Sequence, residues 1–138
     1  MKIENYDYQK LFESGNWMVR FDNDGVSPSE DANEFRWSPI GEWTECPNWN
    51  DTPSCGHGLH GQSPRGHGCC IPGSRFVLCE TEGKQVIVDG NKVKVRRARI
   101  VATNSDVPVE FWSIGYLDLR SYGHPLPAGL ASVGGDLY

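Results

Sequence analysis

Residues 54–70 read SCGHGLHGQSPRGHGCC and hold three of the five cysteines and three of the four histidines of this 138-residue chain. Thiolate sulfur and imidazole nitrogen bind zinc, and they also serve as nucleophile and base in thiol catalysis. Five glycines in the same stretch predict a tight loop rather than a helix. A metal site or a reactive thiol is therefore to be sought here first.

A tetrahedral zinc site needs four such ligands. The spacing does not match the CxxC pairs of zinc knuckles, the adjacent cysteines 69 and 70 cannot easily face one ion, and Cys79 lies in an apolar run typical of a core. The best set is Cys46, Cys55, His60 and Cys69. Zinc is the one cofactor that the sequence suggests, and a glycine-shaped loop with free thiols is the favoured alternative.

A catalytic thiol is a second hypothesis for the same segment. Cys55 is close to His57 in sequence, and Cys69 is close to His67. Histidine can serve as the base that generates a thiolate, but catalytic pairs are usually assembled across the fold rather than along the chain. Sequence proximity alone is therefore weak support for thiol chemistry.

Three tryptophans stand in a longer irregular segment, residues 35–72, among proline and glycine: Trp37, Trp43 and Trp49. A run of this length without regular structure is usually functional or braced by other groups. Tryptophan dominates the energetics of protein interfaces and is equally common in cores. The segment is therefore expected to supply either a binding surface or part of the core.

Regular structure is expected on both sides of this segment. Asn5 is predicted to cap a short helix that runs to about Ser14 and stops at Gly15, and NWMVRF (16–21) reads as a strand. KQVIV and KVKVRRARIVA flank a turn at residues 89–91, and Asp-Gly between two β-branched runs is a strong hairpin signal. A break in alternation at residues 96–97 predicts a bulge.

The second arm of this hairpin carries five cations: Lys92, Lys94, Arg96, Arg97 and Arg99. Such an arm could contact phosphate or an acidic surface, or it could be a solvated face that protects a strand edge. The formal net charge of −5 argues against a protein that binds nucleic acid over its whole surface. The three tryptophans and these five cations are the candidate binding residues.

The composition places limits on the class of protein. Sixteen glycines and nine prolines, with five each of Trp, Tyr and Phe, predict an α+β, mostly β single domain. The N-terminal stretch MKIENYDYQKLFES has no continuous apolar run, and no later stretch reaches the length of a membrane span. We therefore expect a cytoplasmic protein with no membrane partner.

The C-terminal region contains an internal echo. Gly115–Tyr116–Leu117 recurs twenty residues later as Gly135–Asp136–Leu137, a spacing typical of one solenoid coil. Residues 112–138 are expected to form one solenoid-like β-repeat unit packed on a globular β-rich domain of residues 1–111. With a single repeat, the chain looks like an excised fragment or a shortened relative of a repeat protein. GGDLY would then be an edge strand through which a second copy could add to give a homo-oligomer.

Several short motifs resemble small phage and prophage proteins of uncharacterised function. The box CGHGLH (55–60) is followed by GSRFVLCETEGKQVIVDGNKVKVRRARIV (73–101), and LDLRSYGHPLPAGLASVGGDLY (117–138) resembles a phage repeat of GGDLYLR strands and HPLPAGL corners. The resemblance implies a phage-encoded interaction module that binds a host protein or complex. Inhibition of a host defence is the specific role it would suit.

An alternative resemblance is to ADP-ribosyltransferases, which bind NAD. The order of a strand with Arg20, a box with His60 and Ser63, and later β-rich segments is similar to their layout. Those enzymes also use a late glutamate on a strand, which KVKVRRARIVA lacks, and Glu110 is the one substitute. Without that carboxylate the positive transition state loses its electrostatic partner, so the resemblance implies a degenerate, binding-only relative.

Overall fold

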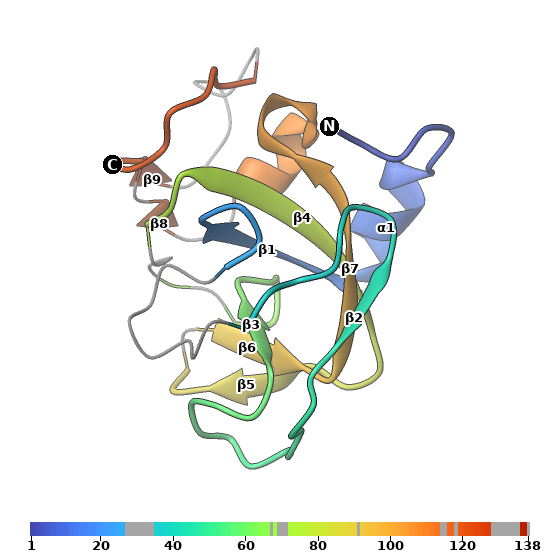
Figure 1. Cartoon of the computed structure of the whole chain (residues 1–138), viewed down its shortest axis with the longest axis vertical. Coiled ribbons are helices and arrows are strands. Elements are labelled where there is room, and N and C mark those ends of the chain that lie inside the picture. Colours follow the sequence, from blue (N-terminus) through green and yellow to red (C-terminus); the bar gives the residue numbers. More distant parts are fainter. Residues whose placement is uncertain are drawn as a thin grey trace.

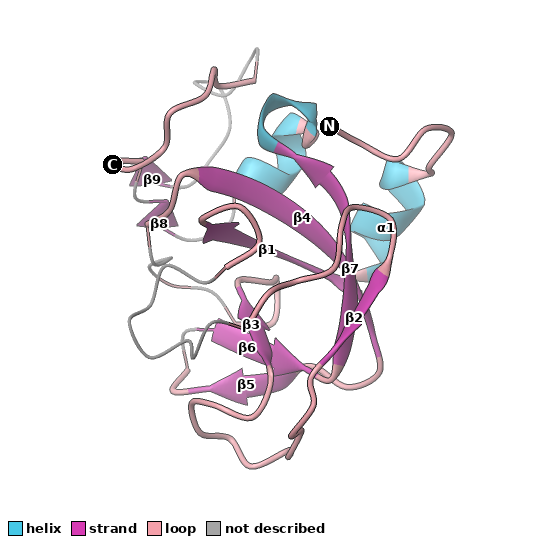
Figure 2. Cartoon of the chain, viewed as in Figure 1, coloured by secondary structure: helices cyan, strands magenta, loops and turns pink. Residues whose placement is uncertain are grey.

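The computed structural model describes residues 1–26, 35–66, 68, 72–90, 92–113, 116–117, 119–127 and 136–137, with the backbone alone at 116–117 and 136–137. Within these ranges the chain is mostly β, with one short N-terminal helix and two antiparallel sheets (Figures 1 and 2), as the composition predicts. None of the helices in the described part of the chain is long and apolar enough to cross a membrane.

The larger sheet has four strands in the order β1(Trp17–Asp22), β4(Arg75–Glu82), β7(Arg97–Thr103), β2(Trp43–Glu45). All neighbours in it are antiparallel. The N-terminal residues lie beside β7, on the same side of it as β2. Ile3 N donates to Val101 O at 2.9 Å, and Thr103 N donates to Met1 O at 2.8 Å. The strand expected at residues 16–21 is confirmed as β1, whose two ends each lie one residue later in the chain.

Alternating side chains of this sheet form two cores. On one face Trp17, Val19 and Phe21 pack with helix α1(Tyr8–Ser14) and with the short helix η2(Val109–Trp112), which follows η1(Asn104–Asp106) in the chain. On the other face Met18 and Val77 pack against the second sheet. We call these the helix-side core and the sheet-side core.

The helix begins later than the sequence suggests. Asp7, not Asn5, is its N-cap, and the Asp7 side chain accepts a hydrogen bond from Lys10 N at 3.0 Å. Gly15 ends the helix with φ of 71°, as predicted. Both residue types are good caps, but Asn5 lies in a turn before the helix with φ of 57°, whereas Asp7 directly precedes the first helical residue.

The smaller sheet has the order β3(Leu59–Gly61), β6(Lys92–Val95), β5(Val86–Val88). The central hairpin is confirmed: β5 pairs antiparallel with β6, and Asp89 and Gly90 both have positive φ in the turn. The break in alternation marks a change of sheet and not a bulge, because β6 ends at Val95 and β7 begins at Arg97 in the larger sheet.

The C-terminal echo corresponds to a backbone pairing. Strands β8(Tyr116–Leu117) and β9(Asp136–Leu137) are parallel, with Tyr116 opposite Asp136 and Leu117 opposite Leu137. The two copies of the repeated motif therefore pair in register. Two strands of two residues are not a solenoid, and the described residues contain no solenoid. The solenoid-like unit, its boundary near residue 112 and oligomerisation through β9 stay predictions.

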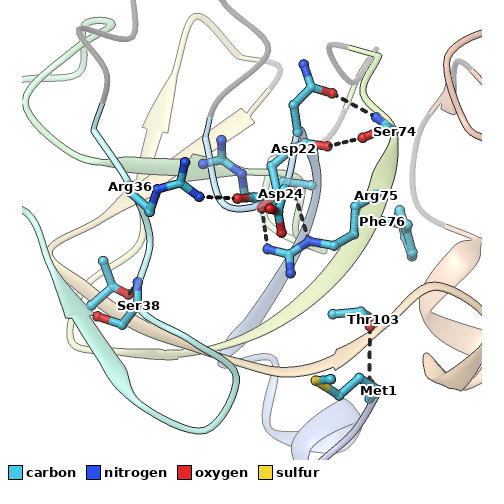
Figure 3. A network of polar contacts seen from close by, with 12 residues as sticks. Met1, Asp22, Asp24, Arg36, Ser38, Ser74, Arg75, Phe76 and Thr103 are labelled. Carbon is cyan, nitrogen blue, oxygen red and sulfur yellow. Dashed lines mark hydrogen bonds and ion pairs between the residues drawn. The ribbon is translucent and has the colours of Figure 1, made fainter.

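A polar network ties the start of β4 to the end of β1 (Figure 3). Asp22 is fully buried, and Arg75 Nε and Nη2 donate to its two carboxylate oxygens at 2.8 Å each. Ser74 adds two hydrogen bonds next to this pair. Its backbone N donates to Asn23 Oδ1 at 3.0 Å, and its Oγ donates to Asp22 O at 3.5 Å. The bidentate pair fixes the register of the edge strand β1 against β4 at the last position of their pairing.

Arg75→Met is expected to lower the free energy of unfolding by roughly 3 kcal/mol, because it leaves the buried Asp22 carboxylate without its counter-charge. Urea unfolding followed by tryptophan fluorescence measures the change. Arg36→Met is the matched control, since Arg36 is exposed and its guanidinium donates to a backbone carbonyl, Asp24 O. Equal losses in both variants would contradict a special role for the pair.

Candidate functional site

Residues 46–58, which we call the Cys55 loop, connect β2 to β3 and cover the outer face of the smaller sheet. Val93 and Val95 of β6 face the sheet-side core, so Lys94 between them points the other way. Lys94 is nevertheless fully buried. The loop that buries it includes Trp49, Asn50 and Gly56, and Figure 1 shows this connection sweeping past β5 and β6.

The ammonium of Lys94 braces the Cys55 loop from inside. Its Nζ donates to Asn50 Oδ1 at 3.3 Å and to Gly56 O at 3.2 Å, and it lies 5.6 Å from the ring centroid of Trp49. Gly58 packs directly on its stem, because a Cβ at that position would lie 2.8 Å from Lys94 Cβ. The predicted irregular segment is thus ordered by one buried cation.

Further contacts fix the tip of the loop. Asn50 N donates to His57 O at 3.2 Å, and His57 Nδ1 lies 3.1 Å from Asn48 O. Lys92 Nζ donates to Cys55 Sγ at 3.3 Å. The side chain that contacts the Cys55 thiol is therefore a lysine of β6, and the imidazole of His57 is engaged with Asn48.

The predicted zinc ligands fall at separate places. Cys46 Sγ contacts Asn48 Oδ1 at 3.3 Å, Cys55 contacts Lys92, and His60 lies on β3. Cys69 is outside the described residues, as are Cys70 and His67. The described part of the chain has no group of three histidine, cysteine or acidic side chains that could hold a metal. Zinc binding and thiol catalysis stay predictions.

Two of the four transferase-like residues are neighbours. Arg20 Nη1 donates to His60 O at 3.0 Å, and its guanidinium lies 5.0 Å from the Trp37 ring centroid. Ser63 is buried and donates to Gln85 Oε1 at 2.8 Å. Glu110 is in η2, whose Phe111 and Trp112 belong to the helix-side core. Its helix therefore lies across the larger sheet from the Arg20–His60 pair.

His60 lies in a positive environment. Its pKa is lowered from 6.5 to about 4, mainly by burial and in addition by charge repulsion from Lys92, Arg20 and Lys94. Its Nε2 atom is buried and has no hydrogen-bond partner among the described residues. In register, His60 stands opposite Lys94 in the β3–β6 pair.

The structure divides the candidate binding residues into buried and accessible sets. Trp37 is 5 % exposed and belongs to the sheet-side core, and Lys94 is 0 % exposed. Trp43 is half-buried on β2, with Arg97 Cζ at 4.3 Å and Arg99 Cζ at 5.1 Å from its ring centroid. The cationic arm is therefore split: Arg97 and Arg99 lie at Trp43, the two lysines lie at the Cys55 loop, and Arg96 between them is exposed.

The arginines that stack on Trp43 are held by carboxylates. Arg97 pairs with Glu45 at 3.1 Å and with Glu82 at 3.0 Å, and Arg99 Nε pairs with Glu80 at 2.8 Å. Burial and Glu80, which accepts from the Tyr6 hydroxyl at 2.7 Å, together raise the pKa of Tyr6. We call this set the Trp43 surface: Trp43, Glu45, Glu80, Glu82, Arg97 and Arg99.

An open groove adjoins the Trp43 surface. Three residues of that surface also line the groove: Glu45, Glu82 and Arg97. Its other lining residues are Trp49, Asp51, Gly83, Lys84 and Arg96. The sequence analysis identified the tryptophans and cations here but missed the acidic partners. Glu80 and Glu82 alternate on one strand as Arg97 and Arg99 do on another, and this shared period of two was the available signal.

Gly58→Ala is expected to lower the free energy of unfolding by about 2 kcal/mol, because the added Cβ meets the stem of Lys94, which cannot swing away. Urea unfolding measures the stability, and amide hydrogen exchange at residues 50–58 reports the loosened loop. Gly123→Ala is the control, since its Cβ would meet no atom within 4 Å. Unchanged exchange in Gly58→Ala would show that the loop does not depend on this contact.

The depressed pKa of His60 predicts a pH-dependent stability. The unfolded state binds the proton below about pH 6.5 and the folded state only near pH 4, so the contribution of His60 is complete above pH 6.5 and is lost between these values. The difference between wild type and His60→Gln, measured by urea unfolding from pH 7 to pH 4, should show this slope. A parallel pair of profiles would contradict the assignment, as would an NMR titration of His60 near 6.5.

Comparison with known protein families, with curated proteins and with solved structures found no match to this chain. Its function has to be inferred from the geometry of its own residues. The described structure offers two distinct features for that purpose. They are the Trp43 surface with its groove, and the Cys55 loop with the two lysines of β6.

Proposed function

We propose that the protein is a protein-binding module whose contact surface is centred on Trp43. The resemblance to phage proteins makes a host protein or complex the expected partner, and inhibition of a host defence the specific role. The observation that carries the proposal is the stacking of Arg97 and Arg99 on a tryptophan that is only partly buried.

Tryptophan and arginine are the residues most enriched among interface hot spots. A binding surface made from them loses affinity if their side chains must be ordered on association. On the Trp43 surface that ordering is already present, because each arginine is fixed both by the ring and by at least one carboxylate. The surface therefore offers a large aromatic contact at low entropic cost.

The charge of this surface favours a protein partner over nucleic acid. Arg97 and Arg99 are neutralised by Glu45, Glu80 and Glu82, so the surface presents no uncompensated row of cations for a phosphate backbone. The transferase-like alternative needs the Glu110 carboxylate beside Arg20 and His60, and η2 lies across the larger sheet from them. Binding without catalysis is the function that this arrangement supports best.

Trp43→Ala is expected to weaken partner binding by on the order of 2 kcal/mol, about thirtyfold, because it removes the centre of the contact. A tagged pull-down from bacterial lysate with mass spectrometry identifies the partner, and calorimetry with the purified partner measures the affinity. Circular dichroism and a melting curve verify that the variant is folded.

Ile87→Ala is the matched control. Ile87 is also an exposed hydrophobic residue, at 47 %, but it lies on β5 of the other sheet. A single stoichiometric complex that survives Ile87→Ala and is lost in Trp43→Ala supports the proposal. No complex at all, or a complex that Trp43→Ala retains, would overturn it.

A further inference from the structure

Lys94 of β6 is the one fully buried cation among the described residues, and Lys92 lies two positions before it on the same strand. Arg75, Arg97 and Arg99 each pair with a carboxylate. Within the described part of the chain no carboxylate pairs with Lys92 or Lys94, whose partners are a thiol, an amide oxygen and a backbone carbonyl. A fully buried ammonium with neutral partners is rare, because its lost hydration is repaid only in part.

Lys92 brings a second positive charge to the same face. It lies two residues before Lys94 on β6, so both side chains project from the outer side of the smaller sheet. Unlike Lys94, Lys92 is part-exposed, and its contact with Cys55 is at the surface. Burial is the main cause of the lowered pKa of His60, which stands opposite Lys94, and the charges of Lys92 and Lys94 add to it.

The backbone of the loop adds donors at this place. Gly56 O points at the Lys94 ammonium, and in a trans peptide the following N–H, that of His57, points in the opposite direction. No described residue accepts a hydrogen bond from His57 N. Gly56 and His57 both have positive φ, and a Cβ on Gly56 would meet nothing within 4 Å, so the space beside the turn is open.

We propose that the turn at Cys55–Gly58 and Lys92, supported by the buried Lys94, form a binding site for a phosphate group. The backbone N–H of His57 and the ammonium of Lys92 would donate charge-assisted hydrogen bonds to its oxygens. The phosphate would give Lys92 the counter-charge that it lacks among the described residues, and the buried Lys94 would add to the positive potential behind the loop. The Trp43 surface is not part of this site, so the proposal stands apart from the proposed function.

A titration with inorganic phosphate, and a second with ADP, tests the site in the full-length protein. Amide NMR shifts should be saturable and concentrated at residues 55–58 and 92–94. Lys92→Gln should weaken binding about tenfold, through loss of one charge-assisted hydrogen bond. Lys10→Gln is the matched control, because it removes the same charge from an exposed residue of α1.

The two ligands distinguish the sources of the phosphate. Equal affinity for both supports a site for the phosphate group alone, and tighter binding of ADP supports a phosphate site that also contacts the nucleoside. Lys94→Gln is not required for the test, so a folding defect there does not affect it. The absence of saturable shifts at residues 55–58, or equal weakening by Lys10→Gln and Lys92→Gln, would overturn the proposal.

Discussion

The buried ammonium of Lys94 is the constraint on which the order of the Cys55 loop depends. Residues 46–58 contain no helix or strand, and the larger sheet does not cover them. Their order comes from a central donor that bonds to Asn50 and Gly56 and lies beside the Trp49 ring. A cation serves here where other small domains use a metal or a disulfide to hold a long loop.

The change of sheet at Arg96 explains why one cationic segment has two different environments. In β6 the side chains that point outward are lysines, and they lie under or beside the Cys55 loop. In β7 the outward side chains are arginines, which lie opposite the glutamates of β4. Arginine suits the second place because its planar group can stack on Trp43 and bind carboxylates in the same plane. The compact lysine ammonium suits the narrow space under the loop.

The hairpin, the mostly β class and the first strand could be predicted because local signals decide them: Asp-Gly for the turn, and alternation for the strands. The placement of Trp37 in the core and of Trp43 at the surface could not, since both lie in the same irregular segment and differ only in what packs on them. The burial of Lys94 was also beyond prediction. Its alternation with Val93 and Val95 indicates a solvated face, and only the loop folded back over it makes that face interior.

The net charge of −5 and the local excess of positive charge at the Cys55 loop act over different distances. At physiological ionic strength charges are screened beyond roughly 8 Å, so the overall negative charge slows the approach of an anion more than it opposes contact. At contact, the donors of Lys92 and His57 act through charge-assisted hydrogen bonds, which are stronger than neutral ones. A protein that is acidic overall can therefore contain a specific site for an anion, because such a site depends on the few groups within hydrogen-bonding distance.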